Sequence, residues 1–178
     1  MALATEQSLP FSTPWRALQI FSTYRLILAL AMLGVFMFSP QASFLGDENP
    51  QLYYVCALSF LLFAATSLLL SFTLNRFYYL QLEVQVLLDI TLIILLMHAS
   101  GGITSGLGVL IAVSTSAASI LTGNPAALGF SVLASFGILG EEIYANLVNS
   151  HVRDGMTQVG ILSVTFMATS LMSFYLSR

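Results

Sequence analysis

Polar side chains within apolar runs are the residues of this sequence best suited to chemistry. Asp89 interrupts the apolar run of residues 77–97, and Gln81 and Gln85 precede it at intervals of four. Residues four apart share a helix face, and an acid near the middle of a membrane helix costs about 2.5–3.5 kcal/mol even on lenient insertion scales. We therefore expect this face to contact protein or water. Asp89 and Gln85 form a candidate ligand site, proton relay or signalling contact, and a satisfied structural hydrogen bond is the alternative.

A second acid lies in the run of residues 126–148. Gly137, Gly140, Glu141 and Tyr144 occupy positions i, i+3, i+4 and i+7, so they share one helix face. A tyrosine hydroxyl can donate a hydrogen bond to a carboxylate of a neighbouring helix. These four residues are candidates for partner binding or signalling, again with a structural hydrogen bond as the alternative.

The stretch HASGGITSGLG, residues 98–108, contains four glycines between two apolar runs. A phosphate-binding P-loop requires a lysine after its second glycine, whereas Leu107 follows Gly106 here. A dinucleotide fingerprint requires a third glycine between a strand and a helix. Neither pattern fits, so we expect Gly101 and Gly102 to form a tight turn whose backbone excludes a Cβ.

Recognised catalytic and metal-binding patterns are absent from the sequence. His98 and His151 do not have HExxH spacing, Cys56 is the sole cysteine, and no GxSxG occurs. A metal centre needs several clustered ligands. We expect no catalysis, cofactor or metal site within this chain.

Composition indicates an integral membrane protein. Of the 178 residues, 57% are hydrophobic and 7% are charged, and the mean hydropathy is +0.90. Soluble domains carry about 25% charged residues, so most of this surface must face the lipid bilayer. The formal net charge of -3 is small and its residues are scattered, which argues against a nucleic-acid partner.

Segment lengths predict an all-α fold. A bilayer core of about 30 Å needs about 20 apolar residues per helix, whereas barrel strands alternate over about ten residues, and runs such as ALAMLGVFMF do not alternate. The length of the first run and its internal Arg25 argue against a cleaved signal peptide. We expect residues 1–178 to form one polytopic bundle of six transmembrane helices, at 18–38, 52–74, 77–97, 105–121, 126–148 and 156–176.

Small residues recur along the run of residues 105–121. Gly108, Ala112, Ser116 and Ser119 share one face at helical spacing. Such stripes allow helix backbones to approach closely in lipid. Spacing alone does not separate a contact within the fold from a contact with a partner, so Gly108, Ala112 and Ser116 are kept as candidate partner-binding residues.

Arginine positions predict the orientation of the bundle. The chain has no lysine, and cytoplasmic loops of membrane proteins are enriched in basic residues. Six crossings place Arg153 on one side and four arginines on the other, namely Arg16, Arg25, Arg76 and Arg178. We therefore expect both termini in the cytoplasm. We also expect Arg25 to snorkel to the cytoplasmic interface rather than reach Asp89.

Three features together resemble the membrane domain of PilS-type sensor histidine kinases. They are Tyr24-Arg25 in the first helix, LLDI at 87–90 followed by HASGGITSGLG, and GEEIY at 140–144. The most specific feature is the acid of LLDI followed by the ASGG-x-x-SGLG turn. The resemblance covers essentially the whole chain.

This resemblance implies a sensor input module of the bacterial inner membrane. A PAS domain, a phosphoacceptor-histidine dimerisation domain and a kinase domain that uses ATP and magnesium would follow Arg178 in a longer chain. The resemblance further implies a homodimer formed through the full-length kinase. The partner sensed would be a membrane-inserted pilin helix, and phosphotransfer would reach a response regulator that controls type IV pilus genes.

Two main classes of function follow from these features. In the first, a partner helix docks in a groove of small and polar residues formed by the third, fourth and fifth helices, and the sixth helix relays the change to cytoplasmic domains. In the second, the chain is a small secondary transporter or channel subunit with Asp89 as a coupling acid. Transporters commonly contain inverted repeats, which this sequence lacks. A scaffold or assembly subunit is a third alternative.

Overall fold

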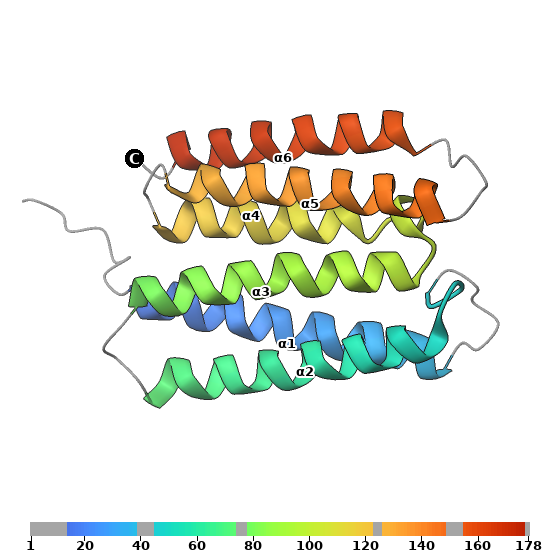
Figure 1. The fold of residues 1–178 in the computed structure, drawn as a ribbon. Helices are drawn as coiled ribbons and strands as arrows, with labels where there is room; N and C mark the ends of the chain where they lie inside the picture. The colour runs from blue at the N-terminus through green and yellow to red at the C-terminus, as the bar shows by residue number, and fades with distance from the viewer. Residues whose placement is uncertain (1–13, 39–44, 74–77, 123–125, 149–154, 177–178) are drawn as a thin grey trace, which may run out of the picture.

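Six helices make up most of the structure, a computed structural model that describes residues 14–38, 45–73, 78–122, 126–148 and 155–176. These residues contain no strand. The predicted all-α fold of six helices is therefore confirmed (Figure 1). The elements, including one short 3-10 turn, are α1 Pro14–Phe38, α2 Pro50–Thr73, α3 Tyr78–Ala99, η1 Gly102–Ser105, α4 Gly108–Thr122, α5 Ala126–Val148 and α6 Met156–Leu176.

The lengths of these helices suit a multi-pass membrane protein. Five of the six described helices are long and apolar enough to cross a membrane, and the exception is α4, with 15 residues. At 1.5 Å per residue α4 spans about 22 Å, and the preceding turn η1 lengthens the crossing. The fourth helix begins at Gly108 rather than at the expected residue 105, because residues 102–105 form η1.

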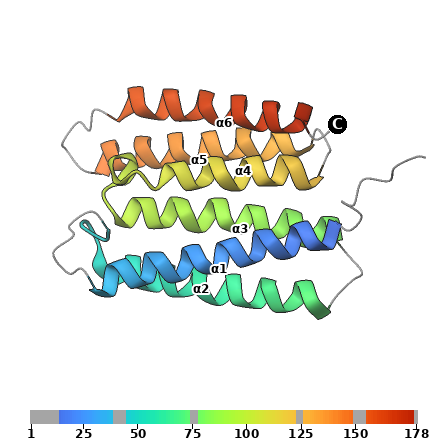
Figure 2. The same ribbon diagram turned by 180° about the vertical axis from the view of Figure 1, so that it is seen from behind.

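Helix α3 lies in the middle of the bundle. Figure 1 and Figure 2 show α1 and α2 on one side of it and α4, α5 and α6 on the other. α2, α4 and α5 pack directly against α3, whereas α1 packs mainly on α2, and α6 packs on α4 and α5. α3 is also the most buried of the five long spans. Its side chains can therefore contact both halves of the bundle.

The chain enters α1 and leaves α6 at the same end of the bundle (Figure 1). The cytoplasmic location of this end stays a prediction. Arg16 at the start of α1 is exposed. Other positions named in the predictions lie outside the described residues, namely Arg76, Arg153, Arg178, His151 and the helical positions 74 and 77.

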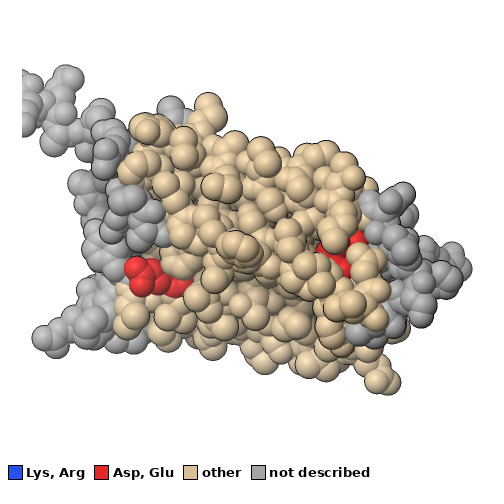
Figure 3. Space-filling view, turned by 45° about the horizontal axis from the view of Figure 1, so that its top comes forward, with Lys and Arg blue, Asp and Glu red and all other residues tan. Residues whose placement is uncertain are grey.

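Figure 3 shows a broad uncharged middle on one face, with acidic groups only toward the two ends. This distribution suits a surface that faces hydrocarbon.

The segment before α2 covers the end of α3. The backbone N–H of Asn49 donates to the carbonyl of Ala99 at 3.1 Å, and the N–H of Gly46 donates to Ser100 Oγ at 3.1 Å. Asn49 Oδ1 also accepts a backbone N–H of the first turn of α2 at 3.1 Å. Asn49 is thus the N-cap of α2, and Pro50 occupies its first position, where its missing N–H costs nothing. These bonds hold α2 beside α3 at the end of the bundle opposite the start of α1.

Glycines make the turn from α3 to α4. Gly101, Gly102 and Gly106 have φ values of +90°, +80° and +73°, a region in which a Cβ is disfavoured. Gly101 and Gly106 flank η1 on its two sides. The turn therefore needs glycine at these positions for α4 to pack back along α3.

We expect Gly101→Ala to lower the free energy of unfolding by about 1 kcal/mol, because alanine would have to adopt the left-handed conformation. A Cβ added at Gly101 would meet no neighbour within 4 Å, so the loss of unfolding free energy would come from backbone strain and not from a steric clash. Thermal unfolding in detergent micelles measures it. Gly129→Ala is the control, since Gly129 is an exposed helical position that is equally free of neighbours, and it should be neutral or stabilising. Equal losses in the two variants would contradict the argument.

Candidate functional site: a charge pair inside the membrane

Asp89 and Arg25 form an ion pair in the interior of the bundle. Arg25 Nη2 and Asp89 Oδ1 are 2.5 Å apart, and the two side chains are 1% and 0% exposed. Because α1 packs mainly on α2, the long Arg25 side chain provides a direct link from α1 to α3. The acid singled out in the sequence is therefore bound to a charge of its own chain.

Matched depths explain why these two residues meet. Arg25 lies eleven positions after Pro14, the first residue of α1, and Asp89 lies eleven positions after Tyr78, the first residue of α3. At 1.5 Å per residue both lie about 16 Å along their helices, well inside a bilayer core of about 30 Å. The prediction that Arg25 snorkels to the interface is wrong. A guanidinium at this depth is neutralised by a carboxylate beside it, which removes the need for a long reach to water.

Neutral side chains complete the surroundings of the pair. Gln85 Oε1 accepts a hydrogen bond from Arg25 Nη1 at 3.2 Å. The guanidinium carbon also lies 4.9, 5.6 and 6.0 Å from the ring centroids of Phe63, Phe21 and Phe60, within the range of cation–π attraction. Arg25 is thus bonded to two groups of α3 and enclosed by rings of α1 and α2.

The ion pair contributes little net free energy to folding, but breaking it is costly. Withdrawing two charges from water costs several kcal/mol per ion, and mutual attraction offsets this only when the geometry is good. Asp89 Oδ2 and Arg25 Nε have no hydrogen-bond partner among the described residues. Separating the pair would leave two unneutralised charges in a medium of low dielectric constant. The pair therefore restricts how α1 can move relative to α3.

A second polar cluster lies where α3 ends. His98 Nδ1 and Glu141 Oε1 are 3.1 Å apart, and the rings of His98 and Tyr144 meet edge to face with centroids 5.7 Å apart. The neighbouring Glu142 is 0% exposed, and its carboxylate lies so close to Gly155 that an added Cβ would clash with it. This cluster joins α3 to α5 and to the residue that precedes α6.

Two of the glycines proposed for partner binding make close contacts within the bundle. A Cβ added at Gly108 would lie 2.5 Å from a methyl carbon of Leu162 in α6, and one added at Gly137 would lie 2.5 Å from a methyl carbon of Ile94 in α3. The absence of a side chain therefore allows α4 to approach α6 and α5 to approach α3. In this chain both glycines serve helix packing.

The other candidates on α4 and α5 differ in exposure. Ala112 and Ser116 are half-buried, and the Ser116 hydroxyl donates to the Ala112 carbonyl at 2.7 Å. Gly140 is exposed, a Cβ added to it would meet no neighbour within 4 Å, and Tyr144 is also exposed. The structure thus brings Gln85 next to Asp89 and Tyr144 next to His98, but it does not gather all the candidates into one site.

Two participants were missed when the sequence was read alone, Arg25 and His98. The distances of Arg25 and Asp89 from the starts of their helices are equal in the structure, but the predicted helix starts at residues 18 and 77 placed them seven and twelve residues in, so the predicted helices did not indicate the pairing. No signal pairs His98 with Glu141 either. Among the described residues, no three His, Cys, Asp or Glu side chains are close enough to hold a metal ion.

A comparison with protein families covers almost the whole chain. The family described as the PilS-like transmembrane domain matches residues 10–178. The chain belongs to this family. A curated relative, the sensor protein kinase PilS of Pseudomonas aeruginosa, is 26% identical over 156 residues, which are 88% of this chain and 29% of that protein. This PilS-like chain thus spans less than a third of that relative's length, and the match supports the role of a sensor module. No solved structure matches the chain.

We expect Asp89→Leu to lower the free energy of unfolding by about 3–5 kcal/mol, because Arg25 would remain buried without its counter-charge. The double variant Arg25→Met with Asp89→Leu should recover most of this loss, since apolar side chains then replace both charges. Unfolding of the purified chain in mixed detergent micelles measures both effects.

Glu83→Leu is the matched control for this experiment, because Glu83 is an acid on the exposed side of the same helix. It should change the unfolding free energy by less than about 1 kcal/mol. A double variant no more stable than Asp89→Leu alone would show that the pair does not constrain the fold.

Proposed function

We propose that this chain is the transmembrane input module of a sensor histidine kinase in the bacterial inner membrane. The observation that carries the proposal is the family match over residues 10–178, and the similarity to a sensor protein kinase supports it. Catalysis would belong to further domains of the same protein, which would bind ATP and magnesium and form the homodimer. A response regulator would accept the phosphoryl group and control pilus genes.

The proposed stimulus is a transmembrane helix of a partner, such as that of pilin. A lipid-facing groove of about 410 Å³ lies between α1 and α4, with Ile20 and Tyr24 on one wall and Val113 and Ala117 on the other. Lipid provides no hydrophobic drive between helices, so docking depends on close packing, and a groove offers more contact than a flat face. Because Gly108 already packs on α6, the proposed docking face of α4 is the one that bears Val113.

Helix α6 is the proposed output element. It is the least buried of the five long spans, and its last residue lies at the same end of the bundle as the first residue of α1 (Figure 1). It packs on α4 and α5, so a partner that displaces α4 would also displace α6. Polar and packing contacts in membranes contribute about 1 kcal/mol each, and several together are enough to bias a bundle between two arrangements.

Transport with Asp89 as a coupling acid is the alternative class. A coupling acid must exchange protons with water, and the Asp89 side chain is 0% exposed and paired with Arg25. This observation favours a sensor over a transporter. Substrate-dependent uptake into liposomes that contain the purified chain would reverse that preference.

We expect single cysteines on the α1–α4 groove to form disulfides with cysteines along the pilin helix in oxidised membranes. Val113→Cys, in a Cys56→Ala background, should crosslink because it faces the groove. Phe136→Cys is the control, since it is exposed on α5 at a similar depth. Equal crosslinking at both positions, or none at Val113, would reject the proposed docking face.

We expect the gene to continue in frame beyond codon 178 into a histidine kinase core. In that full-length protein, Asp89→Leu should change the output of a pilin-promoter reporter while the protein remains in the membrane, because α1 would no longer be held to α3. Glu83→Leu should leave the output unchanged. A reading frame without a kinase core would refute the proposed class, and wild-type output from Asp89→Leu would assign Asp89 a purely structural role.

A further inference from the structure

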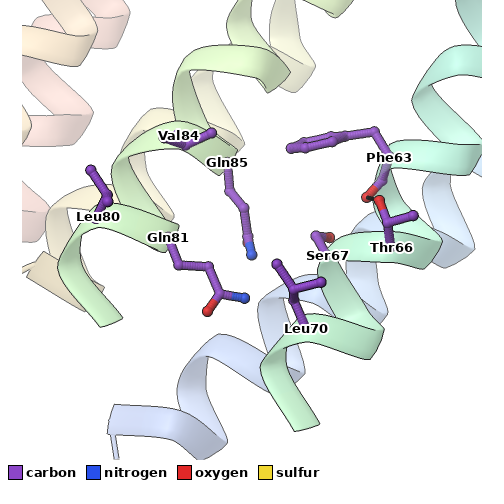
Figure 4. Close-up of a pocket in the computed structure, with 8 residues that line it drawn as sticks. All are labelled: Phe63, Thr66, Ser67, Leu70, Leu80, Gln81, Val84 and Gln85. Atoms are coloured by element: carbon purple, nitrogen blue, oxygen red, sulfur yellow. Dashed lines mark hydrogen bonds between the residues drawn. The ribbon is translucent and has the colours of Figure 1, made fainter. Parts of the chain in front are cut away.

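A cavity of about 280 Å³ lies between α2 and α3, in the half of the bundle where α1 begins and α6 ends. Figure 4 shows that its walls are side chains of these two helices, and none of the lining residues is charged. Leu80 and Val84 line it and are exposed on the lipid-facing surface. The cavity is therefore accessible from the hydrocarbon of the bilayer.

The charge pair determines which atoms of Gln85 face this cavity. Gln85 Oε1 accepts the hydrogen bond from Arg25 at 3.2 Å, and a guanidinium has only donors to offer. The amide oxygen must therefore point to Arg25, which directs the NH₂ group the other way. In Figure 4 the Gln85 nitrogen points into the space between α2 and α3. Gln85 is 2% exposed, and its Nε2 has no hydrogen-bond partner among the described residues.

Gln81 supplies a second donor to the same space. Its Nε2 is likewise buried and unpartnered within the described part of the chain, and it points toward α2 in Figure 4. Residues four apart on a helix have Cβ atoms about 5–6 Å apart, so one ligand can reach both amides. On the opposite wall, the Ser67 hydroxyl already donates to the Ala64 carbonyl at 2.9 Å. The cavity thus presents amide donors from α3 without a competing hydroxyl donor from Ser67.

The lining of the cavity favours a ligand with a neutral hydrogen-bond acceptor over an anionic ligand. An unsatisfied buried donor costs about 1–3 kcal/mol, which a ligand oxygen would recover. Arg25, the nearby cation, is neutralised by Asp89, so the cavity has no free positive charge for a phosphate or carboxylate. A carbonyl oxygen on an apolar molecule satisfies both the donors and the apolar walls.

The size of the cavity fits such a molecule. An apolar cavity of about 150 Å³ holds benzene, and this one is nearly twice as large. It has room for a substituted ring or for the upper part of an acyl chain. A water molecule that accepts hydrogen bonds from both amides would satisfy these donors, but it would leave the apolar part of the lining without contacts.

We propose that the α2–α3 cavity is a binding site for a neutral, membrane-soluble carbonyl compound, held by the amide groups of Gln81 and Gln85. Two sources share this chemistry, the ring carbonyl of an isoprenoid quinone and the ester carbonyl of a phospholipid. Because Gln85 also binds Arg25, an occupied cavity stabilises the arrangement of α1, α2 and α3. This site is independent of the proposed docking of a partner helix between α1 and α4.

The experiment uses the full chain in nanodiscs and separates the two sources. Nanodiscs are prepared from diacyl phosphatidylcholine or from its dialkyl ether analogue, which lacks ester carbonyls, each with and without decylubiquinone. Thermal unfolding is followed by the helical circular dichroism signal. A quinone ligand raises the unfolding midpoint saturably in ether lipid, whereas an ester ligand gives a higher midpoint in diacyl than in ether lipid without quinone.

Two variants test the site without disturbing the charge pair. Gln81→Leu removes one donor and should weaken apparent binding of decylubiquinone about five-fold, or reduce the ester-dependent shift, as expected for the loss of one hydrogen bond. Val84→Phe places a ring at the cavity and should abolish either shift. Gln158→Leu is the matched control, because Gln158 is an exposed glutamine on α6, and it should retain the full shift.

Two results would overturn the proposal. One is a wild-type midpoint that responds to neither decylubiquinone nor ester lipid, which would mean that the cavity holds water only. The other is a shift that persists in both Gln81→Leu and Val84→Phe, which would place the ligand elsewhere or assign the shift to the bilayer. Retention of the Gln158→Leu shift together with loss in the two cavity variants supports the site.

Discussion

The ion pair between Arg25 and Asp89 constrains the arrangement of the whole bundle. A charge inside a membrane is tolerated when an opposite charge lies at the same depth, so these residues restrict both the height and the rotation of α1 relative to α3. The orientation of Gln85 follows from the same contact, because its amide oxygen must face the guanidinium. One interaction thus determines the register of two helices and the donor character of the neighbouring cavity.

Helix α3 makes polar contacts toward both halves of the bundle. Through Asp89 it binds α1, and through His98 it contacts Glu141 of α5. The two contacts lie at different heights, one within the membrane and one where α3 ends. A displacement on either side of α3 therefore acts on a buried or half-buried polar contact, which is the property that a transmembrane sensor needs to relay a change between its helices.

The candidate site was partly predictable from individual residues. Asp89 was identifiable because an acid at that depth is costly wherever its partner lies. Its pairing with Arg25 was not, because an arginine near a helix end can reach water as readily as another helix. Gly108 shows the same limit: its spacing indicated close helix contact, and the structure assigns that contact to α6 of the same chain.

The sequence alone determined the membrane environment, the six helices and the glycine-dependent turn between α3 and α4. These properties depend on hydrophobicity, segment length and the backbone freedom of single residues, all of which are local. Only the tertiary structure decided that Arg25 neutralises Asp89, that His98 meets Glu141, and that the amides of Gln81 and Gln85 face a cavity. Those outcomes depend on how neighbouring helices are rotated and spaced, and that geometry arises from the packing of all six helices together.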